Sequence, residues 1–254
     1  MSTGVRAMSA PVVGSLVEVE SWKNVAQLPT THRIISGTCL IRRRCRSGKE
    51  QWMRQGPGRP KRERRTPDHA ELMHNGLRAF AELGYDAVSV RELNDRLGMG
   101  HTFIHDRYGS KNVFWRSVVD HEFHALSSQL APALLSEPED DLHWLAEAVR
   151  VFHRASAEHP HLNQVIDYEA ARESDRLDYL FTLIAPFTTA VRPVFERLVA
   201  AGRIRDIPWH VFYFAITKPA LLYGQEPLSR RLGQTERSDD SGTMAETILR
   251  GLVT

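Results

Sequence analysis

The chain has 254 residues, enough for one or two domains with a sizeable core. Its composition, 42% hydrophobic and 25% charged, argues against a disordered chain or a collagen-like fibre, and its longest apolar runs are far shorter than the ~20 residues that a membrane-spanning helix needs. The net charge of +2 divides into +10 for residues 1–66 and −8 for the remainder, which indicates either an N-terminal contact with nucleic acid or another acidic surface, or a basic tail that is simply solvated.

Residues 1–56 are expected to form a disordered basic leader, because they show no sustained hydrophobic period of 2 or 3.6. The sequence from Met53 onward also resembles a natural protein start. One hypothesis is therefore that translation starts at Met53 and that residues 1–52 come from a start assigned too far upstream. An intact-mass measurement of the native protein checks this hypothesis.

A dense basic run from Gly58 to Arg65 opens the second segment, residues 57–128. Gly-Arg-Pro favours an extended backbone that can carry an arginine into the narrow, strongly negative minor groove of A·T-rich DNA. A flexible basic linker is the alternative. The candidate DNA-contacting residues of this arm are Arg59, Lys61, Arg62, Arg64 and Arg65.

Four helices are predicted next. Thr66-Pro67-Asp68 is a helix start with a capping hydroxyl, and the helix ends at Gly84. Ser89 and Glu92 form a capping box for a short second helix. The turn Gly98-Met99-Gly100 leads to a third helix, His101–Tyr108, and Ser110-Lys111 caps a longer fourth one. Two short helices around a glycine turn, supported by a preceding helix, predict a helix-turn-helix.

The third helix must present a polar or aromatic face to enter the major groove of DNA, while its other face packs inward. Ile104 and Tyr108 are predicted to face inward. The outward set is His101, Thr102, Phe103, His105, Asp106 and Arg107.

The stretch from Leu72 to about Asp120 resembles, without a gap, the DNA-binding domain of TetR-type transcriptional regulators. The residues that carry the resemblance are Phe80 to Leu93, Leu97 to Met99, Ile104, Tyr108, Ser110 and Lys111. The resemblance implies contacts with phosphate or base edges from Ser89 and Arg91, contacts in the groove from Thr102, Phe103, His105 and Arg107, and a phosphate clamp by Lys111 at a helix N-terminus.

The sequence departs from the family pattern at several of these positions. Gly100 replaces a frequent Ser or Thr, Phe103 a common threonine, His105 a frequent tyrosine, and Gly109 the usual proline. Asp106 places an acid near DNA, which costs affinity unless it accepts from a cytosine amino group or pairs with a neighbouring arginine. These departures leave the expected fold intact and make the operator sequence unpredictable.

Residues 129–254 are expected to form a helical regulatory and dimerisation domain, so that the whole protein is all-α. Pro132, Pro138 and the acidic run after them indicate a linker. About five helices follow from the hydrophobic spacing, with Pro219 shortening or bending the one after Pro208. The expected helical ranges are 142–158, 160–172, 177–202 with kinks at Pro186 and Pro193, the segment after Pro208, and 243–252.

The family usually holds a small apolar effector among the helices of this domain and forms a homodimer through the last two long helices. A two-fold pair also lets two helix-turn-helix units read two half-sites. The candidate effector-binding residues are Phe152, Tyr168, Phe181, Ile184, Phe187 and Tyr213, with an ordinary hydrophobic core as the alternative for each of them.

We expect no metal site, cofactor or catalytic centre. The histidines at 143, 153, 159 and 161 lack the i, i+4 spacing and companion motif of a zinc site, and no nucleophile elbow or phosphate-binding glycine loop occurs. Two cysteines, Cys39 and Cys45, cannot make a disulfide framework, so a cytoplasmic, nucleoid-associated protein is expected.

The sequence thus predicts a homodimeric, ligand-responsive, sequence-specific DNA-binding regulator of transcription, a repressor rather than an enzyme. Binding of the effector would tilt the fourth helix and change the spacing between the two reading helices. The alternatives are a ligand-independent regulator or an activator on the same scaffold, or a helical interaction protein that does not bind DNA.

Overall fold

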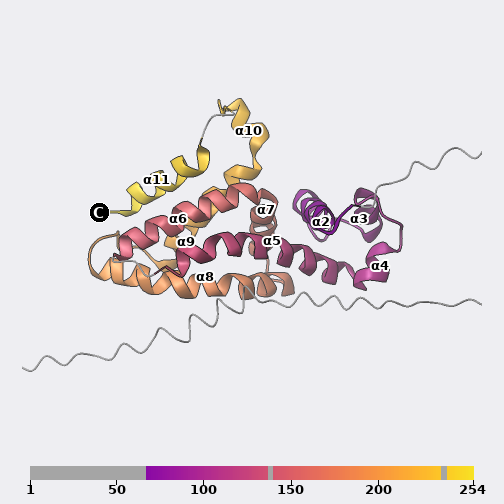
Figure 1. Ribbon diagram of the computed structural model, residues 1–254, viewed down its shortest axis with the longest axis horizontal. Helices are drawn as coiled ribbons and strands as arrows, with labels where there is room; N and C mark the ends of the chain where they lie inside the picture. The colour runs from indigo at the N-terminus through magenta and orange to yellow at the C-terminus, as the bar shows by residue number, and fades with distance from the viewer. Residues whose placement is uncertain (1–66, 137–139, 236–238) are drawn as a thin grey trace, which may run out of the picture.

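A computed structural model describes residues 67–136, 140–235 and 239–254, and every secondary-structure element in these ranges is helical (Figure 1). The basic leader and the arm with Arg59, Lys61, Arg62, Arg64 and Arg65 lie outside the described residues. Four helices come first: α2 (His69–Leu83), α3 (Val90–Arg96), α4 (Phe103–Tyr108) and α5 (Lys111–Leu134). The body of the molecule contains α6 (Asp141–Glu158), α7 (Pro160–Ala170), α8 (Asp175–Ala200), α9 (Trp209–Thr217), the 3-10 helix η1 (Lys218–Gly224), α10 (Glu226–Arg231) and α11 (Asp240–Leu252).

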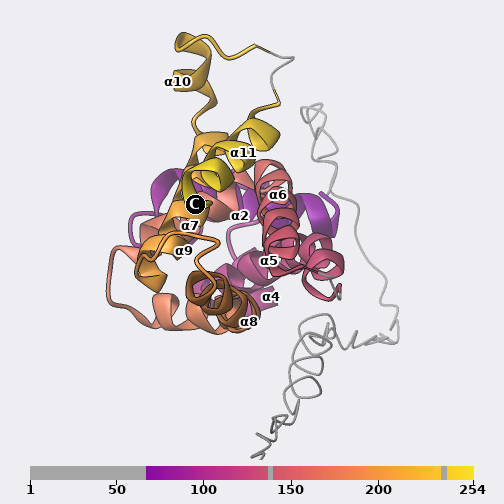
Figure 2. The ribbon, with the colours of Figure 1, turned by 90° about the vertical axis from the view of Figure 1, so that its left-hand side faces the viewer.

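The molecule has two parts that share one long helix. Helices α2, α3 and α4 gather at one end, and α5 runs from this end into the body, where α6 and α8 flank it (Figures 1 and 2). Helix α7 also packs against α2, so the body supports the N-terminal unit from a second side. The short α10 stands away from the bundle in both views.

Side-chain caps define the starts of the N-terminal helices. The carboxylate of Asp68 accepts a hydrogen bond from the backbone N–H of Glu71 at 2.8 Å, and so α2 begins after Asp68. The cap expected at Thr66, with Pro67 inside the helix, is therefore wrong. Ser89 caps α3 through the N–H of Glu92 at 3.1 Å, as the capping box predicted.

Helix α5 is longer than its sequence suggests. Pro132 lies inside the helix, which continues to Leu134, so the linker expected from this proline does not begin there. A proline removes one hydrogen bond near the end of a helix, and the packing of Leu130 and Leu134 in the core compensates for it.

The N-terminal unit is anchored on α5 by a close helix crossing. A Cβ atom at Gly76 would lie 2.7 Å from Cζ of Phe114. Helix α2 therefore approaches α5 more closely than a residue with a side chain at position 76 would allow. Phe114 and its neighbour Trp115 are fully buried. Trp115 forms T-shaped ring contacts with Tyr85, from the α2–α3 turn, and with Tyr179, from α8.

The C-terminal elements follow the expected order with shifted ends. Helix α8 is continuous through both of its prolines. Helix α9 ends at Thr217, and the 3-10 helix η1, which contains Pro219, follows it, in agreement with the predicted shortening of this helix by Pro219. Helix α11 begins at Asp240 instead of Thr243, because the side chain of Asp239 caps it. Helix α10 is not predicted by the hydrophobic spacing.

Candidate DNA-binding surface and effector cavity

The face of α4 that was predicted to read DNA is exposed. His101, Thr102, His105, Asp106 and Arg107 are all solvent-accessible. Within the described ranges, no ion pair or side-chain hydrogen bond occupies the guanidinium of Arg107. The arrangement leaves donors, acceptors and a positive charge on a helix that stands at the end of the molecule (Figure 1).

The opposite face of α4 fixes this helix to the core. Ile104 and Tyr108 are buried, and the Tyr108 ring meets Phe114 of α5 with centroids 4.9 Å apart. Phe103 is half-buried, with its ring 6.1 Å from that of Tyr108, so only part of its ring remains available to DNA. Helix α4 begins at Phe103 instead of His101, because the two preceding residues form a turn.

Asn94 holds this turn and was missed by the sequence analysis. Its fully buried side chain donates from Nδ2 to the carbonyl of His101 at 2.6 Å, and its Oδ1 accepts from the N–H of Ile104 at 3.3 Å. One amide thus joins α3 to the first turn of α4 and fixes the angle between them. The available signal was a polar residue on the inner, apolar face of a short helix.

The start of α3 offers two further candidate contacts. The Ser89 hydroxyl oxygen caps the helix, and the hydroxyl hydrogen remains able to donate to a phosphate. Arg91 is exposed two residues later. Both side chains belong to the first turn of α3, where backbone N–H groups also favour an anion.

Lys111 lies in a more enclosed position than a phosphate clamp requires. Its Nζ donates to the carbonyl of Tyr85 at 2.8 Å and to that of Val88 at 2.9 Å, and it lies 4.3 Å from the centre of the Tyr85 ring. Burial lowers the pKa of the Lys111 ammonium. Two of its three N–H donors therefore hold the α2–α3 turn, and one is left for DNA.

The body encloses an apolar cavity of about 430 Å³ that is bounded by α5, α6, α7, α8 and α9. This volume is in the range of small-molecule sites. Five of the six candidate effector residues line it: Phe152, Phe181, Ile184, Phe187 and Tyr213. Its few polar groups include Asp167 and Lys218, which pair with each other where α7 meets η1.

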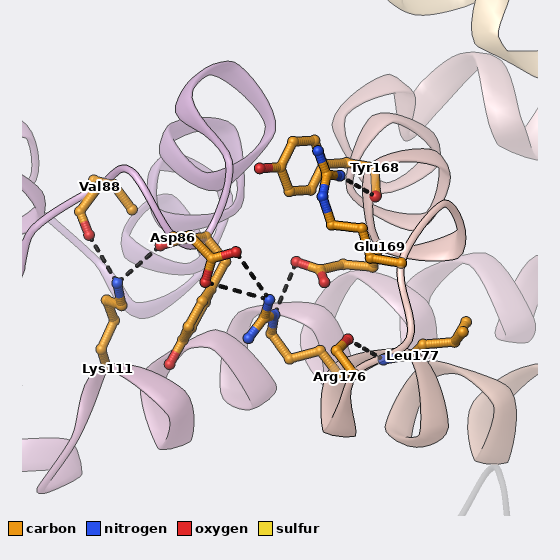
Figure 3. A network of polar contacts seen from close by, with 10 residues as sticks. Asp86, Val88, Lys111, Tyr168, Glu169, Arg176 and Leu177 are labelled. Carbon is orange, nitrogen blue, oxygen red and sulfur yellow. Dashed lines mark hydrogen bonds and ion pairs between the residues drawn. The ribbon is translucent and has the colours of Figure 1, made fainter.

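Tyr168, the sixth candidate, is not among the residues that line the cavity. Its ring packs against Gly84, where a Cβ atom would come within 2.8 Å of it, and the guanidinium of Arg172 lies over the ring at 4.0 Å (Figure 3). Gly84 has φ of 77°, a conformation that suits glycine. Tyr168 thus packs α7 against the end of α2.

Two of the four histidines weighed as metal ligands, His153 and His159, make side-chain contacts in the body. His153 is buried and shares a 2.8 Å hydrogen bond with the hydroxyl of Tyr223, while His159 contacts Glu122 at 2.8 Å. His143 is exposed, and His161 is half-buried on α7. In the described part of the chain, no group of three or more His, Cys, Asp or Glu side chains could hold a metal ion. No helix there is long and apolar enough to span a bilayer.

Comparison with known proteins yields matches in structure alone. No family model and no curated protein matches the sequence. A TetR family transcription regulator from Marinobacter aquaeolei VT8 aligns with a TM-score of 0.55 at 14% identity, over 72% of this chain and 93% of that one. The ketosteroid transcriptional regulator KstR2 of Mycobacterium tuberculosis aligns with a TM-score of 0.56 at 18% identity, over 72% and 94%. The TetR family regulator PfmR from Thermus thermophilus aligns with a TM-score of 0.51 at 21% identity, over 74% and 99%.

Proposed function

Starting from a chain with the fold of the TetR family transcription regulators, we propose that it is a sequence-specific DNA-binding repressor that acts as a homodimer and responds to a small apolar effector. The observation that carries the proposal is the exposed polar face of α4, which a buried inner face and the Asn94 amide hold at a fixed angle. Side chains with matched donors and acceptors on such a helix are what direct readout of base edges requires.

Each group of predicted residues has a role in this proposal. His101, Thr102, Phe103, His105 and Arg107 contact the major groove. Ser89, Arg91 and Lys111 contact phosphates and fix the register of the protein on the duplex. The arm residues Arg59, Lys61, Arg62, Arg64 and Arg65 add a salt-sensitive grip on the minor groove.

Exposed apolar side chains on α8 and α9 support a dimer. Phe181, with 62% of its surface exposed, lies on α8, and Val211 and Phe214 lie on α9. Large apolar groups gathered on neighbouring helices are a common feature of protein interfaces. A second copy that covers these helices would supply the second α4 helix that reading two half-sites requires.

The cavity supports the response to an effector. Its walls are aliphatic and aromatic, and Asp167 and Lys218 already pair with each other at its edge. A ligand with a largely apolar body therefore fits it best, because such a ligand leaves no buried polar group of the cavity unpaired. The effector would release DNA only if it binds the non-reading arrangement of the dimer more tightly.

The test is fluorescence anisotropy of the purified chain on duplexes tiled across the DNA upstream of its own gene, at near-physiological salt with excess nonspecific competitor. One tile bound far more tightly than the others is the expected result. Arg107→Ala should weaken that binding by tenfold or more, on the order of one lost base contact. Arg154→Ala, which removes an exposed arginine from α6, is the matched control.

Two outcomes would contradict the proposal. Equal weak binding to every tile, followed by failure of a genome-wide selection, would leave only nonspecific attraction from the basic arm. Unchanged affinity in both Arg107→Ala and Arg91→Ala would remove α3 and α4 as the reading surface. If specific binding occurs and no apolar compound shifts it, the protein is a ligand-independent regulator.

A further inference from the structure

Arg176, in the first turn of α8, connects the body to the N-terminal unit. Its Nε lies 2.9 Å from Oε1 of Glu169, at the end of α7, and its Nη2 lies 3.4 Å from each carboxylate oxygen of Asp86, in the α2–α3 turn. Its guanidinium also stacks over the Tyr85 ring at 4.0 Å. Figure 3 shows Arg176 between Glu169 on one side and Asp86 on the other.

The turn that Arg176 contacts leads directly into the DNA-reading helices. Lys111 binds the carbonyls of Tyr85 and Val88 from the other side, and Ser89, the cap of α3, is the next residue. The turn is therefore held by α5 through Lys111 and by the body through Arg176. A change at Arg176 alters only the second of these two attachments.

The same corner of the body is a wall of the cavity. Ala170 and Leu177 line the cavity, and they directly follow Glu169 and Arg176 in the sequence. The Glu169–Arg176 ion pair is therefore formed by the sequence neighbours of two residues of this wall. A ligand that displaces this wall displaces Arg176 with it.

The two carboxylates hold Arg176 with different strength. The side chain of Glu169 is 1% exposed, whereas that of Asp86 is 63% exposed. An exposed ion pair contributes little, and breaking a buried one is costly. When the corner moves, Arg176 therefore stays with Glu169 and gives up Asp86 and the Tyr85 ring.

We propose that Arg176 couples the cavity to the DNA-reading helices: occupancy of the cavity near Leu177 withdraws Arg176 from Asp86 and Tyr85 and frees the α2–α3 turn. Freeing the turn would loosen α3 and α4. This inference therefore rests on the proposed function, in which these helices read DNA. The tilt of α5 would be one route from the cavity to the DNA-reading helices. Arg176 provides a second route, which does not pass along α5. Arg176 acts as a positioning residue and does not itself contact DNA or ligand.

Hydrogen–deuterium exchange of the full chain tests the coupling without a known effector. Leu177→Trp fills the cavity at the corner, and Leu177→Phe is a milder version if the first variant folds poorly. Val191→Trp fills the same cavity from a position 14 residues further along α8 and is the matched control. The readouts are peptides that cover residues 84–89 and, as a measure of intact folding, peptides from the middle of α5.

The expected result is exchange about threefold to tenfold faster in residues 84–89 for the Leu177 variant, with α5 unchanged and with no effect of Val191→Trp. Asp86→Asn and Arg176→Gln should each give the same increase, and adding the Leu177 substitution to Arg176→Gln should give no more. Arg176→Lys, which keeps the charge and loses the stacked planar group, should be intermediate.

Two results would overturn the inference. One is exchange in residues 84–89 that stays at the wild-type rate in Arg176→Gln. The other is a Leu177 effect that persists in full when Arg176 is replaced. Neither result depends on DNA, so a failure of the coupling is separate from a failure of the proposed function, which the anisotropy measurement on wild-type protein decides.

Discussion

The carboxylate of Glu122 and the imidazole of His159 join two parts of the molecule through a single 2.8 Å contact between Oε2 and Nδ1. Glu122 is buried on α5, and His159 ends α6 and begins α7. His74 of α2 lies 3.4 Å from the other oxygen of the carboxylate. Burial alone would raise the pKa of Glu122, but the hydrogen bond from His159 and the neighbouring histidines hold it below its ordinary value.

Replacement of Glu122 by Gln should therefore lower the free energy of unfolding by about 2 kcal/mol, because a buried charge-assisted hydrogen bond is lost while the shape is kept. A carboxyl group whose pKa is lower in the folded than in the unfolded chain stabilises the fold at pH values above its unfolded pKa. That stabilisation is lost as the pH falls through the folded pKa. In urea unfolding at a series of pH values, the free energy of unfolding of Glu122→Gln should decrease less on acidification than that of the wild type. The exposed Glu158→Gln is the control, and an equal loss in both would contradict the assignment.

His153 should make stability depend on pH in a second, less acidic range. Burial lowers the pKa of His153 from 6.5 to about 4. The unfolded chain binds a proton below pH 6.5 and the folded chain does not, so the free energy of unfolding should fall as the pH drops from 6.5 to 4, by up to about 3 kcal/mol. His153→Gln, which cannot titrate, should lack this loss in urea titrations; the same slope in variant and wild type would be the contrary result.

The Asn94 clamp gives a prediction about DNA affinity. Asn94→Ala leaves the carbonyl of His101 and the amide of Ile104 without their partner, at a cost of about 1–3 kcal/mol. The orientation of α4 should loosen, and the affinity for the best-bound duplex should fall about tenfold by anisotropy, with the helical circular dichroism signal retained. Arg154→Ala, at an exposed position on α6, should change affinity little. Unaltered binding by Asn94→Ala would show that α4 does not depend on this amide.

Salt dependence separates the two roles that Lys111 can have. A side chain that neutralises a phosphate contributes about one unit to the slope of log affinity against log salt. Arg91→Gln should reduce that slope by about one per subunit. Because two of the donors of Lys111 hold backbone carbonyls, Lys111→Gln should instead lower the melting temperature and the affinity with a smaller change of slope. A full unit of slope and an unchanged melting temperature would instead show that the main role of Lys111 is to clamp a phosphate.

Local signals carried the sequence-based prediction of the N-terminal unit. Ser89 and Ser110 cap their helices through hydrogen bonds to residues three positions later, which spacing alone predicts. The partners of Asn94, Arg176 and Tyr168 lie in other elements, and no period in the sequence shows which side of a helix meets a distant neighbour. Tyr168 was therefore predicted to line the cavity, whereas it packs on Gly84, and Asn94 and Arg176 were not singled out at all.

The helices of the body were also predicted from local signals, and only in outline. Apolar spacing identified the long helices, but proline was read as a stop at Pro132, where core packing on both sides of it carries the helix onward to Leu134. The five candidate effector residues that line the cavity are large and apolar, as core residues also are. Their grouping around one space depends on how five helices meet, which the spacing along each helix does not contain.

The position of Trp115 gives the molecule an internal optical reporter. Its indole is fully buried, with one tyrosine of the α2–α3 turn and one of α8 against it at ring-centre distances of 6.2 and 6.1 Å. The emission of an indole in such a setting changes when a neighbouring ring moves. Replacing the other four tryptophans of the chain, at positions 22, 52, 144 and 209, would leave a single fluorophore where the two parts of the molecule meet. Compounds could then be screened by their effect on this emission, with no label, no DNA and no operator sequence.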